Sequence, residues 1–436
     1  MKKLAILLLA VTLFATAAAD GRRVFRSQFV VHQTREDALA DNCSNNPYYI
    51  KVAPSAVSQR RDAVIYMQSF DTDTAWGDRT TWLHLQNTGS AYTLIVNGKV
   101  AAEVEDALSP ADFDITDALV QGHNTITVEL RQSRLPKMQS GAPAPAAPAF
   151  EGSYIFSQRK AHIHDYTAAI VPDTAEKRGL LNLDIIVAND FAYAVDMTVG
   201  YDIVSPEGKL IDYTIREISL EPRQRDTLHI KTPVYGVEKH AWNTSAGDNA
   251  PLYTVTLYTK RNDKPEEYIS FKTAYGVTSF EDGKLTRNGY KIGIIPHYYR
   301  GVADRAALRR HIREMKTGGV NTFITEYPQP LWFYDECDRA GIFVIDRAAI
   351  YAADTRNVRA RGGTPANDPQ MAGEFIERVD AMYYRVRNHP SLAGFMLAGE
   401  AGNGYSMYKA YQHLKNIEQL RPVVYYDARG EWNSDL

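Results

Sequence analysis

The sequence contains very little cysteine: Cys43 and Cys337 are the only two in 436 residues. They fall in separate predicted domains, so we expect no disulfide framework, even in an oxidising compartment. Neither sign of charge is in excess, because 49 Lys and Arg residues stand against 52 Asp and Glu residues, for a net charge of -3. That balance gives no electrostatic reason to expect a nucleic-acid partner or an anionic membrane.

Long hydrophobic runs are also missing, and the longest lies at the N-terminus. Residues 1–19 begin with two lysines, continue with an apolar stretch over 4–14 and end in three alanines, which is the pattern of a secretory signal. The stretch is too short to span a bilayer. We therefore expect no membrane span, a mature chain that begins near Asp20, and secretion into a bacterial periplasm.

What the chain does have is 44% hydrophobic residues, enough to fill several cores. Residues 20–164 carry short apolar or alternating runs separated by turn sequences, including Asn97-Gly98. Asn-Gly favours a tight hairpin because both turn positions need positive φ. This spacing predicts a jelly-roll β-sandwich. The proline-rich stretch 136–149 is interpreted as a loop before its last strand.

Two pairs of side chains in this region are candidate ligand residues. Trp76 and Trp82 could stack on a sugar, but packing is the favoured interpretation. His162 and His164 lie two apart and so share one face of a strand. A metal pair would need a third ligand, and none is in register, so we interpret both as satisfied surface histidines.

The rest of the chain changes character near residue 281. Residues 165–280 have the strand spacing of an immunoglobulin-like sandwich, and no residue there points to chemistry. In 281–436 strands alternate with helices, which predicts a parallel sheet. Strands are expected at 290–295, 320–325, 342–345, 392–397 and 423–426, and helices at 304–317, 331–340, 367–387 and 405–420.

One stretch of this last part carries a recognisable motif. Residues 385–404 read R-V-R-N-H-P-S-L-A-G-F-M-L-A-G-E-A-G-N-G, and Glu400 comes where a buried strand should end. Catalytic side chains of β/α barrels sit at that end of the strands. The stretch resembles the acid/base signature of glycoside hydrolase family two, which includes β-galactosidases, β-glucuronidases and β-mannosidases. The words V-N-G-K at 96–99 and F-D-I-T at 113–116 extend the resemblance to the first sandwich.

The resemblance implies a fold and an activity. It implies a jelly-roll sugar-binding-type sandwich, an immunoglobulin-like sandwich and an incomplete (β/α)8 TIM barrel of about five strands, at 20–164, 165–280 and 281–436. It also implies hydrolysis of O-glycosidic bonds in a β-glycoside, with Glu400 as the catalytic acid/base and with no cofactor. Homo-oligomerisation is left open.

A full barrel takes about 250 residues and eight strands, whereas roughly 150 residues follow Thr286. Retaining glycosidases need two carboxylates about 5 to 5.5 Å apart, and in the family the nucleophile sits on the seventh strand. We therefore expect an N-terminal fragment of a longer reading frame, inactive by itself.

Other positions of the family's site match only in part. His297 corresponds to the first histidine of the strand-one word, Glu326 replaces a histidine before Tyr-Pro, and Asp346 follows strand three. These three are the predicted substrate-binding residues.

Three further positions depart from the family pattern. Gly399 stands where the family has the asparagine before the glutamate. Tyr351 and Ala353 replace the Glu and His that bind a metal in some members, so no metal site is expected.

Three interpretations remain. The chain is a β-glycosidase fragment, a non-catalytic relative that binds glycans, or a purely structural scaffold. An inverting pair of Glu326 and Glu400 is also conceivable, because two strand spacings give about 9.6 Å between backbones, which overlaps the 6.5–9.5 Å range of inverting enzymes. The sequence does not name the sugar.

Overall fold

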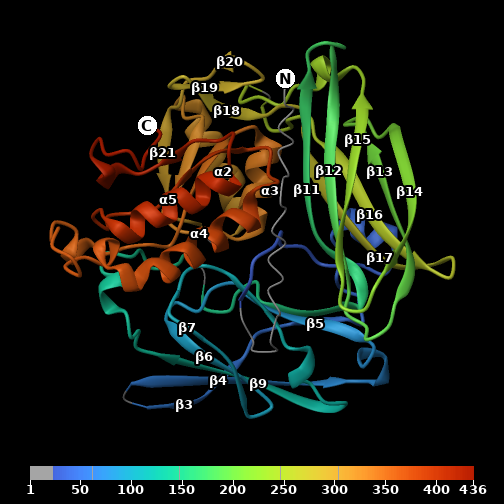
Figure 1. The fold of residues 1–436 in the computed structure, drawn as a ribbon, viewed down its shortest axis with the longest axis horizontal. Helices are drawn as coiled ribbons and strands as arrows, with labels where there is room; N and C mark the ends of the chain where they lie inside the picture. Colours follow the sequence, from blue (N-terminus) through green and yellow to red (C-terminus); the bar gives the residue numbers. More distant parts are fainter. Residues whose placement is uncertain (1–22, 61, 147, 246, 303) are drawn as a thin grey trace, which may run out of the picture.

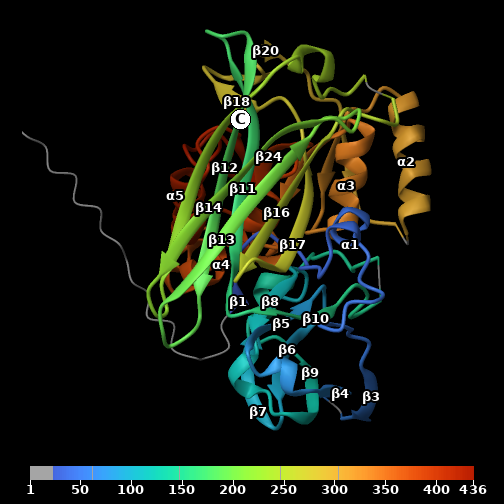
Figure 2. The same ribbon diagram turned by 90° about the vertical axis from the view of Figure 1, so that its right-hand side faces the viewer.

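The computed structural model describes residues 23–436 except 61, 147, 246 and 303, so the predicted signal segment 1–19 lies outside the described residues. Two β-sandwiches and an α/β part are arranged as three bodies (Figure 1). The N-terminal sandwich lies below, and the second sandwich and the α/β part stand side by side above it (Figures 1 and 2). The predicted fold class is confirmed. Among the described residues, no helix has the length and apolarity needed to cross a membrane.

The first sandwich consists of two five-stranded antiparallel sheets with an apolar core between them. One sheet has the order β1 (Arg23–Val24), β8 (Ala111–Asp114), β5 (Arg79–Leu85), β10 (Tyr154–Arg159), β2 (Tyr49–Lys51), and the other β3 (Ser55–Gln59), β4 (Ala63–Thr72), β9 (Gly122–Arg131), β6 (Ala91–Val96), β7 (Lys99–Val104). Asn97 and Gly98 turn the β6–β7 hairpin with φ of 50° and 77°, as the sequence predicts. Trp76 and Trp82 are buried in packing. The short helix α1 (Arg35–Ala40) precedes this sandwich's strands β2 to β10.

The second sandwich packs a three-stranded sheet on a four-stranded one. The first has the order β11 (Ala161–Asp173), β12 (Arg178–Asn189), β15 (Arg225–Val234), and the second β14 (Leu210–Leu220), β13 (Val195–Val204), β16 (Tyr253–Arg261), β17 (Lys264–Thr273). The expectation of surface histidines is wrong here, because His162 and His164 are buried on β11 beside a register shift between Ile163 and Asp165. Burial lowers the pKa of His162 to about 4.

The third part contains a parallel sheet with helices on one of its faces. The sheet order is β21 (Pro296–Tyr299), β22 (Thr322–Thr325), β23 (Phe343–Arg347), β24 (Leu392–Met396), β25 (Val423–Val424), and the helices are α2 (Arg305–Thr317), α3 (Leu331–Ala340), α4 (Ala372–Val386), α5 (Tyr405–Ile417). Asp304 caps α2 by accepting a hydrogen bond from the Ala307 amide, as expected. Five consecutive parallel strands make this an incomplete barrel.

Two expected elements of this part were placed wrongly. The first parallel strand is not 290–295, because Tyr290–Lys291 forms β20 and pairs antiparallel with β19 (Lys284–Arg287), beside β18 (Thr278–Glu281). Asn288 and Gly289 take positive φ of 52° and 81° and close this hairpin, so a second Asn-Gly turn redirects the chain. The helix expected at 367–387 begins at Ala372, after a short 3-10 turn at Pro369–Met371.

The motif before Glu400 joins the three parts of the molecule. Arg387 Nη2 donates to Asp165 Oδ2 at 2.7 Å, and Asn388 Nδ2 donates to Ser27 Oγ at 2.9 Å. The Ala168 amide donates to Asn388 Oδ1 at 3.2 Å. Arg387 and Asn388 therefore dock the barrel strands on β11 and on the N-terminal segment, and in doing so they fix the position of β24.

Candidate active site

The candidate active site is the edge of the parallel sheet where its strands end. Glu326 follows β22, Glu400 follows β24 and Asp427 follows β25. In barrels this edge carries the catalytic side chains, because the βα loops converge there. The structure therefore places two of the four predicted site residues, Glu326 and Glu400, on the expected rim.

Glu400 belongs to a charged network with Arg356 and Asp427. Arg356 Nη1 donates to Glu400 Oε1 at 2.5 Å, and its Nη2 donates to Asp427 Oδ1 at 2.6 Å. The amides of Ala401 and Gly402 donate to Asp427 Oδ2. Burial raises the pKa of Asp427, but the hydrogen bonds from Arg356 and the Gly402 amide outweigh burial and bring it below its ordinary value. Arg356 is thus held by a buried anion and presents its remaining nitrogen to a Glu400 side chain that is 61% exposed.

Glu326 is held separately from Glu400. Its Oε1 accepts a hydrogen bond from Arg300 Nε at 3.1 Å. The Tyr351 hydroxyl donates to the backbone carbonyl of Glu326, and the Tyr351 ring lies against Gly399, directly before Glu400. The two carboxylates therefore engage different guanidinium groups.

His297 and Asp346 lie on the helix-facing side of the sheet. The His297 ring packs against His311 of α2 at 5.3 Å between centroids. Asp346 is fully buried, and its Oδ1 accepts hydrogen bonds from Thr325 Oγ1 and Tyr334 Oη, both at 2.7 Å. Burial raises the pKa of Asp346, and Arg385 offsets part of that rise. These positions suit packing and helix docking rather than contact with a sugar, in contrast to the predicted substrate-binding role.

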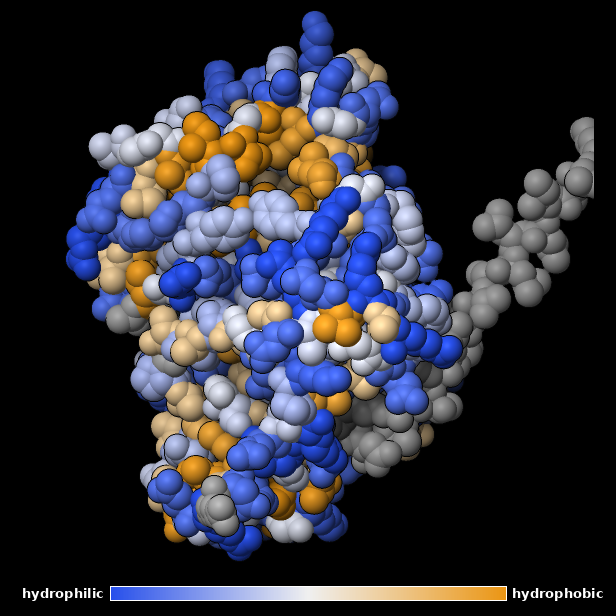
Figure 3. Space-filling model, turned by 90° about the vertical axis from the view of Figure 1, so that its left-hand side faces the viewer, coloured by the Kyte–Doolittle hydropathy of each residue, from blue (hydrophilic) through white to orange (hydrophobic). Residues whose placement is uncertain are grey.

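The opposite face of the sheet has no helix layer among the described residues. Strand alternation places Ile324, Ile345, Met396 and Val424 there, and they form a small apolar cluster. Figure 3 shows the side of the molecule that carries the α/β part, where apolar side chains gather around a hollow near the top. Burial and a hydrogen bond with the Tyr426 hydroxyl raise the pKa of Tyr298 to about 12. Tyr298 lies on β21 and Tyr426 follows β25, so the two tyrosines come from opposite edges of the sheet.

Two family models match this chain, one over its first sandwich and one over its α/β part. Residues 297–435 match the description "Glycosyl hydrolases family 2, TIM barrel domain", and residues 27–139 match "Glycosyl hydrolases family 2, sugar binding domain". The chain belongs to glycoside hydrolase family 2. The resemblance seen in residues 385–404 is thereby confirmed.

Curated relatives of this family-2 chain are much longer than it is. It is 26% identical over 375 residues to a β-galactosidase of Priestia megaterium and 24% identical over 396 residues to one of Streptococcus thermophilus. These alignments cover 83% and 85% of this chain and 36% of each relative. Among solved structures, a Bacteroides uniformis β-glucuronidase superposes with a TM-score of 0.68 at 19% identity, covering 84% of this chain and 46% of the other. A family-2 member from Bacteroides cellulosilyticus gives 0.66 at 18%, covering 84% and 49%. The two structural likenesses show the fold.

The glycine at 399 has a physical explanation in this family-2 chain. A Cβ at Gly399 would lie 2.2 Å from Tyr351 Cε1, so an asparagine and this ring cannot occupy the site together. We expect Gly399→Asn to lower the free energy of unfolding by about 1–3 kcal/mol through overpacking. In a Tyr351→Ala background, where the ring is absent, Gly399→Asn should cost much less than in the parent, as chemical denaturation of the four proteins of a double-mutant cycle would show.

Gly373 provides the control, because a Cβ there meets nothing within 4 Å. Gly373→Ala should leave stability unchanged or raise it slightly. If the effects of Gly399→Asn and Tyr351→Ala simply add, the two positions are not competing for the same space.

Sequence reasoning missed three residues of the site. Asp427 follows a predicted strand, so the rule that selected Glu400 could also have found it. Tyr351 was noted as a departure from the family pattern and not as a neighbour of Gly399. Arg356 lies just after the 3-10 turn Ala353–Thr355, in a loop with no periodic pattern, and no signal in the sequence marks it.

Proposed function

We propose that this chain is the N-terminal part of a family-2 β-glycosidase that hydrolyses O-glycosidic bonds, with Glu400 as its acid/base. The main observation in support is the position of Glu400 after the end of β24. The motif residues Arg387 and Asn388 hold this part of the sheet against β11 and the N-terminal segment. The names of the relatives, β-galactosidase and β-glucuronidase, support a β-glycoside as the substrate. The chain spans about 36% of its curated relatives' length, which supports placing the nucleophile on a barrel strand beyond β25.

The geometry of Glu400 supports a second element of the proposal, that residues 23–436 do not turn over substrate unaided. A general acid works in a closed and partly dry site, and the Glu400 side chain is 61% exposed and paired with Arg356. A retaining mechanism also needs a second carboxylate about 5 to 5.5 Å away. In the described part of the chain, the carboxylate tied to the same guanidinium is Asp427, whose oxygens already accept hydrogen bonds from Arg356 and two amides.

The alternative proposal is a glycan-binding relative without turnover. The Tyr351 ring over Gly399 favours it, because the family's asparagine amide, which would hold the sugar's 2-hydroxyl, has no room there. For either function we propose export to a bacterial periplasm, supported by the pattern of residues 1–19.

Hydrolysis of chromogenic aryl β-galactosides and β-glucuronides tests the proposal. The 436-residue chain should release no aryl alcohol above the buffer rate. A chain expressed with the downstream coding sequence should hydrolyse one of the two substrates, and Glu400→Gln should slow it about 10²- to 10⁴-fold, the usual contribution of a general acid/base. Turnover by the 436-residue chain that Glu400→Ala abolishes would overturn the predicted inactivity.

Glu326→Gln in the extended chain separates the retaining mechanism from the inverting pair. A retaining enzyme with its nucleophile elsewhere should keep most of its turnover, whereas an inverting pair of Glu326 and Glu400 would lose it. Sugar binding by the extended chain, measured by calorimetry and unaccompanied by any turnover, would favour the glycan-binding alternative.

A further inference from the structure

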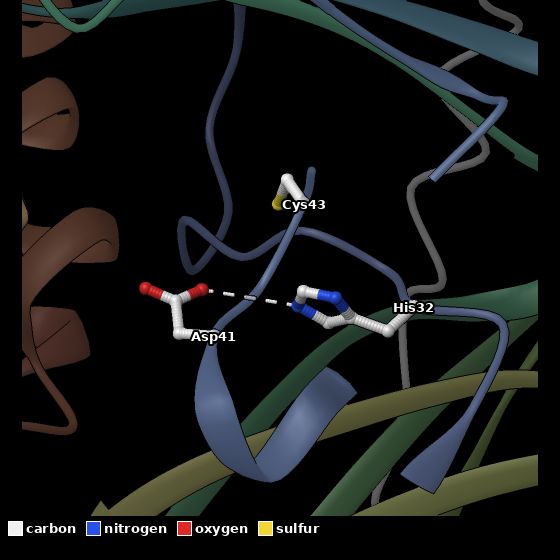
Figure 4. Close-up of side chains that lie close together, drawn as sticks. All are labelled: His32, Asp41 and Cys43. Carbon is white, nitrogen blue, oxygen red and sulfur yellow. Dashed lines mark ion pairs between the residues drawn. The ribbon is translucent and has the colours of Figure 1, made fainter. Parts of the chain in front are cut away.

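A cluster of metal-ligating side chains lies far along the chain from the candidate active site. His32, Asp41 and Cys43 flank the short helix α1 and offer an imidazole nitrogen, a carboxylate oxygen and a thiol sulfur within 4.8 Å of one another. His32 Nε2 and Asp41 Oδ1 are 3.8 Å apart. The ring and the carboxylate point toward each other, and the Cys43 thiol lies beside the line that joins them (Figure 4).

The imidazole of His32 is buried, and one of its two nitrogens has no hydrogen-bond partner in the described part of the chain. Its side chain is 3% exposed, and Nδ1 has no partner among the described residues. Its Nε2 approaches Asp41 only to 3.8 Å, which is too long for a hydrogen bond. A buried polar group left unpaired costs about 1–3 kcal/mol. A ligand on Nε2 would give that nitrogen a partner and would leave the unpaired Nδ1 as it is.

The backbone around His32 holds the imidazole in place. His32 and Tyr268 of β17 exchange both of their backbone hydrogen bonds, each at 2.9 Å. Asn46 Nδ2 donates to the Val31 carbonyl at 2.8 Å. Asp41 ends α1 with a left-handed backbone, so the chain reverses and brings Cys43 back toward His32. The donors are therefore supported by the second sandwich and not only by a free loop.

We propose that His32, Asp41 and Cys43 form a binding site for a zinc-class divalent ion. One thiolate, one imidazole and one carboxylate are ligands that Zn²⁺ accepts, whereas Ca²⁺ and Mg²⁺ prefer oxygen alone. From zinc bond lengths of about 2.0–2.3 Å, tetrahedral donors lie roughly 3.3–3.7 Å apart. His32 Nε2 and Asp41 Oδ1 are 3.8 Å apart, and all three donors lie within 4.8 Å of one another. The observed spacing therefore needs a closure of up to about 1.5 Å, which rotation of the exposed Asp41 side chain and a small movement of Cys43 would supply.

Three protein ligands leave a fourth position open, and its surroundings say what could fill it. All three donors line a cavity of about 880 Å³ that also borders Phe271 of the second sandwich and Asp335 of α3. A tetrahedral zinc ion with three protein ligands binds water or an exogenous donor at the fourth position. The site would therefore present an exchangeable coordination position to a small molecule with a carboxylate, thiol or imidazole group.

A second cluster in the same cavity is the competing location. Asp335, Asp338 and His389 also lie within ligand spacing of one another. Both Asp338 oxygens are already engaged, since Oδ2 is 2.7 Å from His389 Nδ1 and Oδ1 accepts from the Ser391 amide at 2.8 Å. His389 is thereby committed to a structural pair, which favours the site at His32.

Calorimetric titration of the full chain with zinc chloride tests the proposal, and Co²⁺ substitution supplies a spectroscopic readout. One equivalent of zinc should bind, and the cobalt form should show a thiolate-to-metal charge-transfer band. Cys43→Ser should abolish the band, and Cys43→Ser and His32→Gln should each weaken zinc binding by roughly a hundredfold or more, since even outer-shell partners are worth about 10- to 100-fold. Asp41→Asn provides a variant that keeps the fold, because the Asp41 side chain is 78% exposed.

His123→Gln is the matched control, because His123 is an exposed histidine paired with Asp71 at 3.1 Å, and it should bind zinc like the unaltered chain. Asp335→Asn addresses the competing cluster. A charge-transfer band that survives in Cys43→Ser, zinc binding that Asp41→Asn leaves intact, or zinc binding that is lost in Asp335→Asn alone would each overturn the proposal.

Discussion

Replacement of Asp165 by alanine is expected to lower the free energy of unfolding by about 3–5 kcal/mol, the usual cost of breaking one partner out of a buried ion pair. Asp165 Oδ1 accepts hydrogen bonds from the Ser27 and Tyr166 amides at 3.0 and 2.7 Å, and Oδ2 accepts from Arg387. Both members of the Asp165–Arg387 pair are at most 10% exposed. The alanine variant leaves the guanidinium and two amides without their acceptor, so the cost exceeds that of one lost hydrogen bond.

Urea unfolding followed by fluorescence measures this effect. Asp173→Ala is the control on the same strand, because Asp173 pairs with Arg178 in a more exposed position and should cost less than about 1 kcal/mol. Asp165→Asn keeps the acceptor and removes the charge, so it should fall between the two. Equal losses for Asp165→Ala and Asp173→Ala would show that the contact between β11 and the barrel contributes little.

The second large effect concerns pH and Glu267, which lies between the two sandwiches. Burial raises the pKa of Glu267 from its ordinary value of 4.5 to about 8, although the Ile163 amide and the positive charge of Arg79 partly oppose the rise. The carboxyl thus holds its proton more tightly in the folded chain than in the unfolded chain. The stability that Glu267 contributes is therefore greatest at low pH, falls as the pH rises from about 4.5 to about 8, and changes no further above that. The loss should reach about 3–5 kcal/mol, because a pKa difference of one between the folded and unfolded chains is worth about 1.4 kcal/mol.

Glu267→Gln should remove this dependence and leave the chain more stable than the parent at pH 8. Denaturation midpoints of the two proteins at about pH 5, 6.5 and 8, which bracket the expected fall, would show it. Glu217→Gln is the control, since Glu217 is an exposed glutamate on β14, and it should retain the slope of the parent. A parent whose stability does not fall across this range would mean that Glu267 ionises freely in the folded chain.

Local chemistry in the sequence predicted the helices of the third part well. The α2 helix follows an Asp304 cap and ends at Gly318, and α3 ends at Gly341 with φ of 63°. These signals lie within a few residues of the helix they delimit. The first parallel strand begins later than expected because the Asn288-Gly289 turn pairs Tyr290–Lys291 antiparallel with β19, and this turn is also a local signal in the sequence.

Other features depended on contacts that no local pattern contains. His162 and His164 are buried by surfaces from distant strands, and the register shift between Ile163 and Asp165 is not visible in the alternation of residues. For the site, the strand-end rule found Glu326 and Glu400. A match to a family motif does not determine which face of the sheet a side chain occupies. A shift of one residue along a strand moves the side chain to the opposite face. Asp346 was therefore assigned to the wrong face for contact with a substrate.

The proline-rich loop of the first sandwich also reaches the rim of the sheet. The Ala146 amide donates to Tyr327 Oη at 2.8 Å, and the Ser140 carbonyl accepts from the Ala353 amide at 3.0 Å. Ala142 and Leu108, from that same sandwich, pack with Tyr351. Loops accept insertions and deletions far more readily than strands do. A lineage can therefore change what reaches Glu400 by lengthening or shortening a segment that folds with another domain, so selectivity can evolve while the chemistry stays under separate selection.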